Sequence, residues 1–126
     1  MQYFDKLLDE FISTYQREKH SNTLSNEELL LEAQLGFAKA SDQATWSKDQ
    51  SEFLSNRIAG SRATDEFDQN GFGGPHVVRF KYYCMGYLLG LYKSGFITDK
   101  QFTLAELQLP GFIALHLPKL DSVATR

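Results

Sequence analysis

The sequence is short of the residues that covalent and metal cross-links require. It contains one cysteine, Cys84, so a disulfide within the chain is impossible. Its three histidines, at positions 20, 76 and 116, have no metal-ligand spacing to one another or to that cysteine, and the zinc-protease pattern HExxH is absent. We therefore expect no metal ion, and a core held together by packing.

Common motifs of catalysis and nucleotide binding are also missing. There is no Gly-x-Ser-x-Gly nucleophile elbow, and the glycines at 71, 73 and 74 lack the Lys-Ser or Lys-Thr of a phosphate-binding loop. Cys84 lies in the most apolar stretch of the chain, which predicts a buried and inert thiol. We expect no cofactor and no catalytic residue of these kinds.

Long hydrophobic runs are absent as well. No segment has the ~20 uninterrupted apolar residues of a membrane-spanning helix. Residues 1–6 lack the basic and apolar regions that open a signal peptide. With 126 residues, 42% hydrophobic and 23% charged, the composition is typical of one globular domain over 1–126. We expect a cytoplasmic protein with no membrane partner.

The charge is acidic and uneven. The net charge is −3; residues 1–70 carry thirteen acids and seven bases, whereas residues 71–126 carry three acids and six bases. The acidic half is a candidate face for a basic partner, although charges can simply coat the outer faces of amphipathic helices. The nearest approach to a basic stripe with aromatics is Arg79, Lys81 and the two tyrosines that follow, on a helix that we expect to be mostly core, so we expect no nucleic acid.

Helical spacing of apolar residues predicts the first two helices. The first runs from about residue 2 to about residue 19 with one apolar stripe. The second begins at a capping box formed by Ser25 and Glu28 and ends at about Ala40. Its apolar residues are broadly spread, which predicts a well-buried helix.

A third helix is predicted over about 47–59. Ser47 and Gln50 have capping-box spacing, and Gly60 is the expected stop. Four side chains are expected to face inward: Trp46, Phe53, Leu54 and Ile58.

The second half predicts the central helix of the fold. Residues 77–92 are apolar nearly all round, which is typical of a helix buried on every side. Pro75 suits its first turn, and Gly95 suits a left-handed cap after its end. Gly86 and Gly90 are expected to allow close packing of a neighbouring helix.

A fifth helix is predicted to begin at a capping box formed by Thr98 and Gln101 and to stop before Pro110, at about Gln108. The apolar residues 111–117 that follow suit either a short helix or an extended segment laid on the bundle. The predicted fold class is therefore all-α: a single-domain bundle of about five helices, with a central apolar helix and an apolar C-terminal segment.

The segment 64–74 has no helical period and is acidic, aromatic and rich in glycine, so we expect a loop. It begins like a calcium-binding loop, but Glu66 replaces the first aspartate and Val77 the closing bidentate glutamate, so no calcium is expected. A recognition loop and a plain solvated connection are both open. The candidate partner-binding residues are Asp65, Glu66, Phe67, Asp68, Asn70, Phe72 and His76.

The leading functional expectation is a small inhibitor that binds one protein, in general character a toxin-immunity protein or antitoxin. Its acidic face would cover the active site of a basic partner such as a nuclease toxin, with charge speeding association and aromatics anchoring it. Two alternatives stay open. One is a small enzyme in which His76 and loop carboxylates form an acid–base pair; the other is a structural or assembly subunit. The oligomeric state is not predicted.

Overall fold

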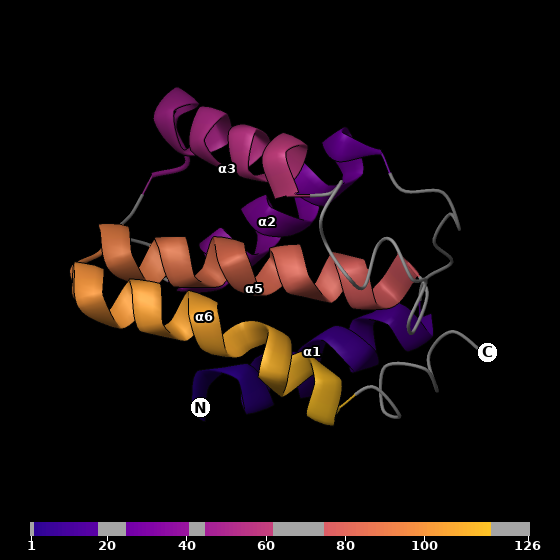
Figure 1. The fold of residues 1–126 in the computed structure, drawn as a ribbon. Helices are drawn as coiled ribbons and strands as arrows, with labels where there is room; N and C mark the ends of the chain where they lie inside the picture. Colours follow the sequence, from indigo (N-terminus) through magenta and orange to yellow (C-terminus); the bar gives the residue numbers. More distant parts are fainter. Residues whose placement is uncertain (1, 18–24, 41–44, 62–74, 117–126) are drawn as a thin grey trace.

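The computed structural model describes residues 2–17, 25–40, 45–61 and 75–116 (Figure 1). In these ranges the backbone forms five helices and no strand, which confirms the predicted all-α bundle. The helices are α1 (Gln2–Arg17), α2 (Asn26–Ala40), α3 (Lys48–Ser61), α5 (Pro75–Lys93) and α6 (Asp99–Leu115). None of them is both long enough and apolar enough to cross a bilayer.

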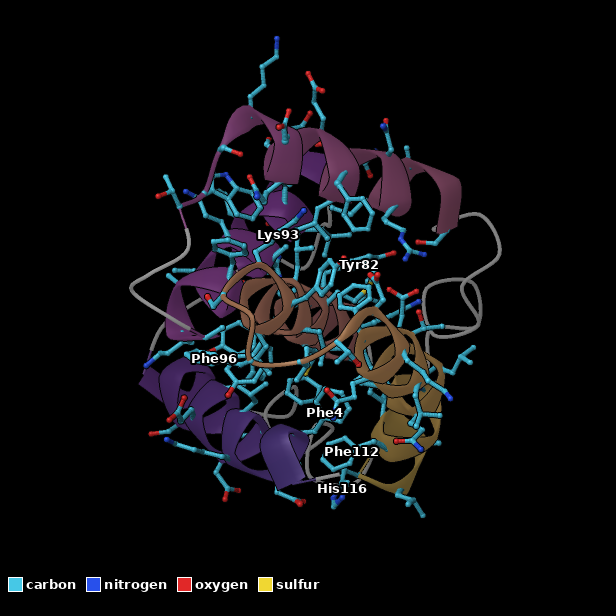
Figure 2. All side chains as sticks on the ribbon, turned by 90° about the vertical axis from the view of Figure 1, so that its left-hand side faces the viewer. Phe4, Tyr82, Lys93, Phe96, Phe112 and His116 are labelled. Carbon is cyan, nitrogen blue, oxygen red and sulfur yellow. The ribbon has the colours of Figure 1, made fainter. Side chains whose placement is uncertain are left out.

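Helix α5 is the centre of the bundle, as the sequence predicts. It crosses the middle of the molecule in Figure 1, and in the turned view of Figure 2 it lies below α3 and above α1 and α6. From Val77 to Leu91 every residue except Lys81 and Tyr87 is buried. Cys84 is among the buried residues, and burial raises the pKa of its thiol well above the ordinary value. The prediction that this thiol is buried is confirmed.

Glycines allow α2 and α5 to pack backbone against backbone. A Cβ atom on Gly86 would lie far inside van der Waals contact of the Ala33 carbonyl oxygen, and one on Gly36 would do the same at the Tyr83 carbonyl oxygen. A Cβ on Gly90 would lie 2.6 Å from the Cβ of Ala40. This confirms the close packing predicted for Gly86 and Gly90, and Gly36 supplies the matching space on α2.

The predicted capping boxes begin the helices where local sequence places them. The Ser25 amide donates to Glu28 Oε1 at 3.3 Å, and the Glu28 amide donates to Ser25 Oγ at 3.1 Å. The Thr98 and Gln101 pair is reciprocal in the same way, with distances of 2.9 Å and 3.1 Å. These bonds satisfy amide groups that a helix start would otherwise leave unpaired.

The end of α5 also follows the prediction. Gly95 has a φ of +80°, the left-handed conformation that glycine adopts without steric cost. The Phe96 amide donates to the Leu91 carbonyl at 2.9 Å, and the Gly95 amide donates to the Tyr92 carbonyl at 3.0 Å. This pair of bonds defines a Schellman cap. It turns the chain back so that α6 packs beside α5.

The third helix differs from its prediction in two respects. It continues through Gly60 to Ser61, because Gly60 does not have the positive φ of a helix stop. Phe53 was expected to face inward but is 40% exposed, whereas Leu54 and Ile58 are buried. The prediction for Phe53 was wrong because the side of α3 that packs on the bundle is narrow. It buries Leu54 and Ile58, and Phe53 lies at the edge of that side.

The predicted stop before Pro110 is wrong, because α6 runs through it to Leu115. Proline removes one helical hydrogen bond, but it does not prevent a helix that packing supports on both sides. Leu109 and Ile113, before and after the proline, are both buried, and the Phe112 ring packs at 5.4 Å from that of Phe4. Residues 111–115 are therefore the last turn of a helix.

Candidate functional site

The predicted recognition loop lies outside the described residues. Six of its seven predicted contact residues belong to the segment 62–74, and the seventh, His76, has its backbone in the first turn of α5 but its side chain outside the description. The partner contacts expected of this loop, and the pairing of His76 with Glu66 or Asp68, stay predictions.

An ion cluster around the buried Arg79 joins the acidic half of the sequence to the basic half. Arg79 is 3% exposed; its Nη2 lies 2.7 Å from Glu28 Oε2, and its Nη1 lies 3.9 Å from Glu32 Oε1. The hydrogen bond from Arg79 lowers the pKa of Glu28. Arg79 therefore holds α2 against α5 and does not belong to a surface stripe with Lys81. The basic stripe with aromatics that the sequence suggested for this helix therefore lacks Arg79, its first basic residue.

Other acids of the first half also face bases within the described part of the chain. Glu10 Oε2 lies 3.9 Å from Lys39 Nζ, and Glu52 Oε1 lies 3.7 Å from Lys48 Nζ. Such exposed pairs are worth little to stability. They show that part of the acidic charge of the first half is matched by neighbouring bases.

The outward face of α6 is apolar from residue 104 to the end of the helix. Leu104 is 53% exposed, Leu107 is 73% exposed and Leu115 is 80% exposed. With Gly111 these leucines fall on one side of the helix, since residues three, four or seven apart share a face. We call these four residues the α6 stripe. The other exposed residues between 103 and 115 are also without charge: Thr103, Gln108 and Ala114.

The stripe is not among the sequence predictions, because Pro110 predicts a helix end at about Gln108. In a helix that stops there, Leu115 has no fixed relation to Leu104 or Leu107. The continuation through Pro110 adds the last two members and lengthens the face to residues 104–115. The signal was present in the leucine spacing on the two sides of the proline.

Helix α2 has a smaller exposed apolar face, which corrects the prediction that this helix is well buried. Leu31 is 59% exposed and Leu35 is 58% exposed. The broad spread of apolar residues on α2 reflects two apolar faces, of which one packs on α5. The outer face also carries charge, because Lys39 is exposed and pairs with Glu10 of α1.

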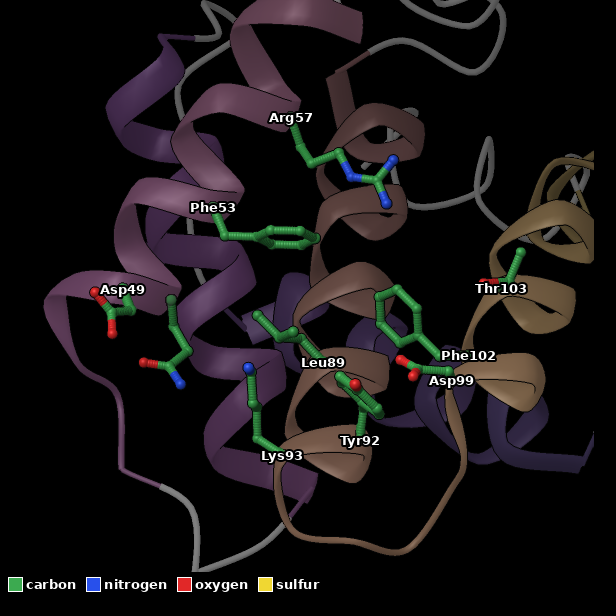
Figure 3. Close-up of a pocket in the computed structure, with 10 residues that line it drawn as sticks. Asp49, Phe53, Arg57, Leu89, Tyr92, Lys93, Asp99, Phe102 and Thr103 are labelled. Carbon is green, nitrogen blue, oxygen red and sulfur yellow. The ribbon is translucent and has the colours of Figure 1, made fainter.

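A groove lies between α3 and α6 with α5 as its floor (Figure 3). It encloses about 380 Å³. Phe53 of α3 and Phe102 of α6 stand on opposite sides of it, and Leu89 and Tyr92 of α5 lie between them. Leu89 is 3% exposed, so the floor belongs to the hydrophobic core. We call this space the α3–α6 groove.

Charged side chains at the groove hold its aromatic walls. The Arg57 guanidinium lies 5.2 Å from the centroid of the Phe53 ring and 2.8 Å from Glu106 Oε1, so it links α3 to α6. On the other wall the Tyr92 and Phe102 rings are 5.5 Å apart. The Tyr92 hydroxyl donates a hydrogen bond to Asp99, which raises the tyrosine pKa.

No local motif marks this groove in the sequence. Its walls come from segments about fifty residues apart, and their meeting depends on how α3 and α6 each pack on α5. Among the described residues, no three His, Cys, Asp or Glu side chains gather in a way that would hold a metal ion. Comparison with protein families, with curated proteins and with solved structures found no match to this chain.

Proposed function

We infer that this chain works by binding another protein, and that it neutralises a basic partner in the manner of a toxin-immunity protein or antitoxin. The observation that carries the proposal is the α6 stripe. Three leucines more than half exposed share one helix face, which carries no charge between residues 104 and 115. Exposed apolar patches with polar rims are typical of surfaces that a partner covers.

The stripe has the chemistry of an interface anchor. Covering a fully exposed leucine side chain contributes roughly 1.5–3 kcal/mol. These three are 53%, 73% and 80% exposed, so each contributes a part of that amount to a binding free energy. Between residues 104 and 115 this face carries no charge, so a partner that covers it there avoids the cost of desolvating an ion. A partner that fits the α6 stripe presents a row of apolar side chains, either along one face of a helix or along an extended segment.

The charge of the chain favours a basic partner. The net charge is −3, and the predicted recognition loop holds three of the acids that contribute to it, Asp65, Glu66 and Asp68. Opposite charges on a partner speed the encounter, whereas apolar contacts slow dissociation. The proposal assigns the first role to the acids and the second to the α6 stripe.

The experiment compares three immobilised proteins exposed to native lysate of the source organism: wild type, Leu104→Ser/Leu107→Ser and Leu31→Ser/Leu35→Ser. The second pair is the matched control, since it removes from α2 two leucines that are also more than half exposed. We expect one basic protein to be retained in stoichiometric amount by wild type and by the α2 variant, to be lost from the α6 variant, and to elute with salt.

The activity of the retained protein is then measured with and without the added chain, and inhibition completes the support. Equal retention by all three proteins, or a partner whose activity does not change, would count against the proposal. Light scattering on the purified chain separates it from the assembly-subunit alternative, which requires a mass above that of the monomer.

A further inference from the structure

We propose that the α3–α6 groove is a small-molecule site, and that it takes a planar, largely apolar carboxylate. This proposal is independent of the partner-binding function, because the groove lies between α3 and α6 and none of the leucines of the α6 stripe lines it. Three observations support it: the shape of the groove, the contacts that hold the side chains of its walls in place, and the distribution of charge around it.

The shape suits a flat apolar group. The groove encloses about 380 Å³, within the range of about 300–1,000 Å³ that is usual for ligand pockets. Phe53 and Phe102 stand on opposite sides, and Leu89 closes the floor between them (Figure 3). A planar ring placed there meets an aromatic side chain on each side and an aliphatic side chain below.

The walls of the groove are held by contacts within the protein. Phe53 is 40% exposed, yet its ring lies under the Arg57 guanidinium at 5.2 Å, and Arg57 is itself fixed by Glu106 at 2.8 Å. Phe102 packs at 5.5 Å on Tyr92, whose hydroxyl is bonded to Asp99. Side chains that are held in advance lose little conformational entropy when a ligand binds.

The charge points to an anionic ligand. Among the charged lining groups, Arg57 is paired with Glu106, and Asp99 accepts the bond from Tyr92. The Asp49 carboxylate points to the outer side of α3, away from the space between the two phenylalanines (Figure 3). Among the described residues that line the groove, one basic group has no ion-pair partner and is left for a ligand.

That group is the ammonium of Lys93. It lies 5.5 Å from the centroid of the Tyr92 ring and, in the described part of the chain, has no ion-pair partner. It comes from the last turn of α5, at the edge of the apolar floor (Figure 3). A ring between the phenylalanines can therefore direct a carboxylate to Lys93, which donates a charge-assisted hydrogen bond.

The test is calorimetric titration of the purified chain with naphthalene-2-carboxylate and with the neutral naphthalene-2-carboxamide. The two probes have the same ring and differ in charge. We expect saturable binding of the carboxylate, about tenfold tighter than the carboxamide, because a hydrogen bond to a charged group is stronger than a neutral one. Lys93→Gln should remove the difference, and Phe53→Ala should weaken both probes.

Lys100→Gln is the matched control, since Lys100 is exposed and lies outside the groove lining. It should bind both probes as wild type does, and circular dichroism should show every variant folded. Absence of saturable binding at millimolar carboxylate, equal affinity for the two probes, or an unchanged preference in Lys93→Gln would overturn the proposal. Leu104→Ser/Leu107→Ser should retain probe binding, so that failure here and failure of the partner-binding function are separate results.

Discussion

Arg79 and Glu28 form an ion pair across fifty-one positions of sequence, with 2.7 Å between Nη2 and Oε2. The arginine side chain is 3% exposed and the glutamate side chain 32% exposed, so the pair spans from the core to the surface. Glu28 also caps its own helix through Ser25. One carboxylate therefore both begins α2 and joins it to α5.

Loss of Arg79 should destabilise the fold strongly. Arg79 is buried and also lies 3.9 Å from the buried carboxylate of Glu32. Removing one partner of a buried ion pair leaves a buried charge without its counter-charge and typically costs about 3–5 kcal/mol. We expect Arg79→Ala to lower the free energy of unfolding in urea by about 3 kcal/mol. Lys81→Ala, on the same helix but half-buried, should cost less than about 1 kcal/mol. Equal effects would mean that the pair does not hold the helices together.

The same pair should make stability depend on pH. Arg79 lowers the pKa of Glu28 below its ordinary value of 4.5. A carboxyl group with a depressed pKa in the folded state adds stability above its unfolded pKa, and that stability is lost as the pH falls through the folded pKa. The difference in unfolding free energy between wild type and Glu28→Gln should therefore be largest above pH ~5 and shrink below pH ~4. Glu27→Gln is the control, because Glu27 is exposed. A difference that is constant with pH would contradict this origin.

Glycine at position 86 is required by the backbone of α2. A Cβ there collides with the carbonyl of Ala33, so even alanine forces α2 and α5 apart. We expect Gly86→Ala to destabilise by about 3 kcal/mol, the upper end for an overpacked core. Gly60→Ala should stabilise by up to about 1 kcal/mol, since a Cβ there meets nothing within 4 Å and alanine favours the helix. Thermal unfolding distinguishes them, and an unchanged melting temperature for Gly86→Ala would show that the two helices are not in contact.

Replacement of Pro110 should stabilise α6. The helix passes through this residue without the amide donor that position 110 would otherwise supply. Pro110→Ala restores that donor and a good helix former, so we expect a gain of roughly 1–3 kcal/mol in urea unfolding. A loss of stability would indicate that packing of the proline ring contributes more to the free energy of unfolding than the restored hydrogen bond does.

These elements differ in how far the sequence alone predicts them. Helix starts at Ser25 and Thr98 and the cap at Gly95 depend on residues within a few positions, so local patterns predict them correctly. Pro110 is a local signal that tertiary packing overrides, because the buried side chains before and after it hold both parts of the helix. Gly36 is similar, since its role appears only when α5 lies against it.

The candidate sites were less predictable. The α6 stripe depends on a helix that continues past proline, and the α3–α6 groove on three helices meeting around Leu89. Neither has a motif. The predicted loop, from Asp65 to Phe72, rests on composition alone and stays a prediction.

The central claim is that the α6 stripe faces a partner, and a photocrosslink tests it most directly. A photoreactive phenylalanine analogue is placed at Leu107 and, as the control, at Ser55 on the exposed face of α3. After irradiation of cells of the source organism, position 107 should give one adduct with a basic protein, and position 55 should give none. No adduct from position 107, or the same adducts from both positions, would contradict the account.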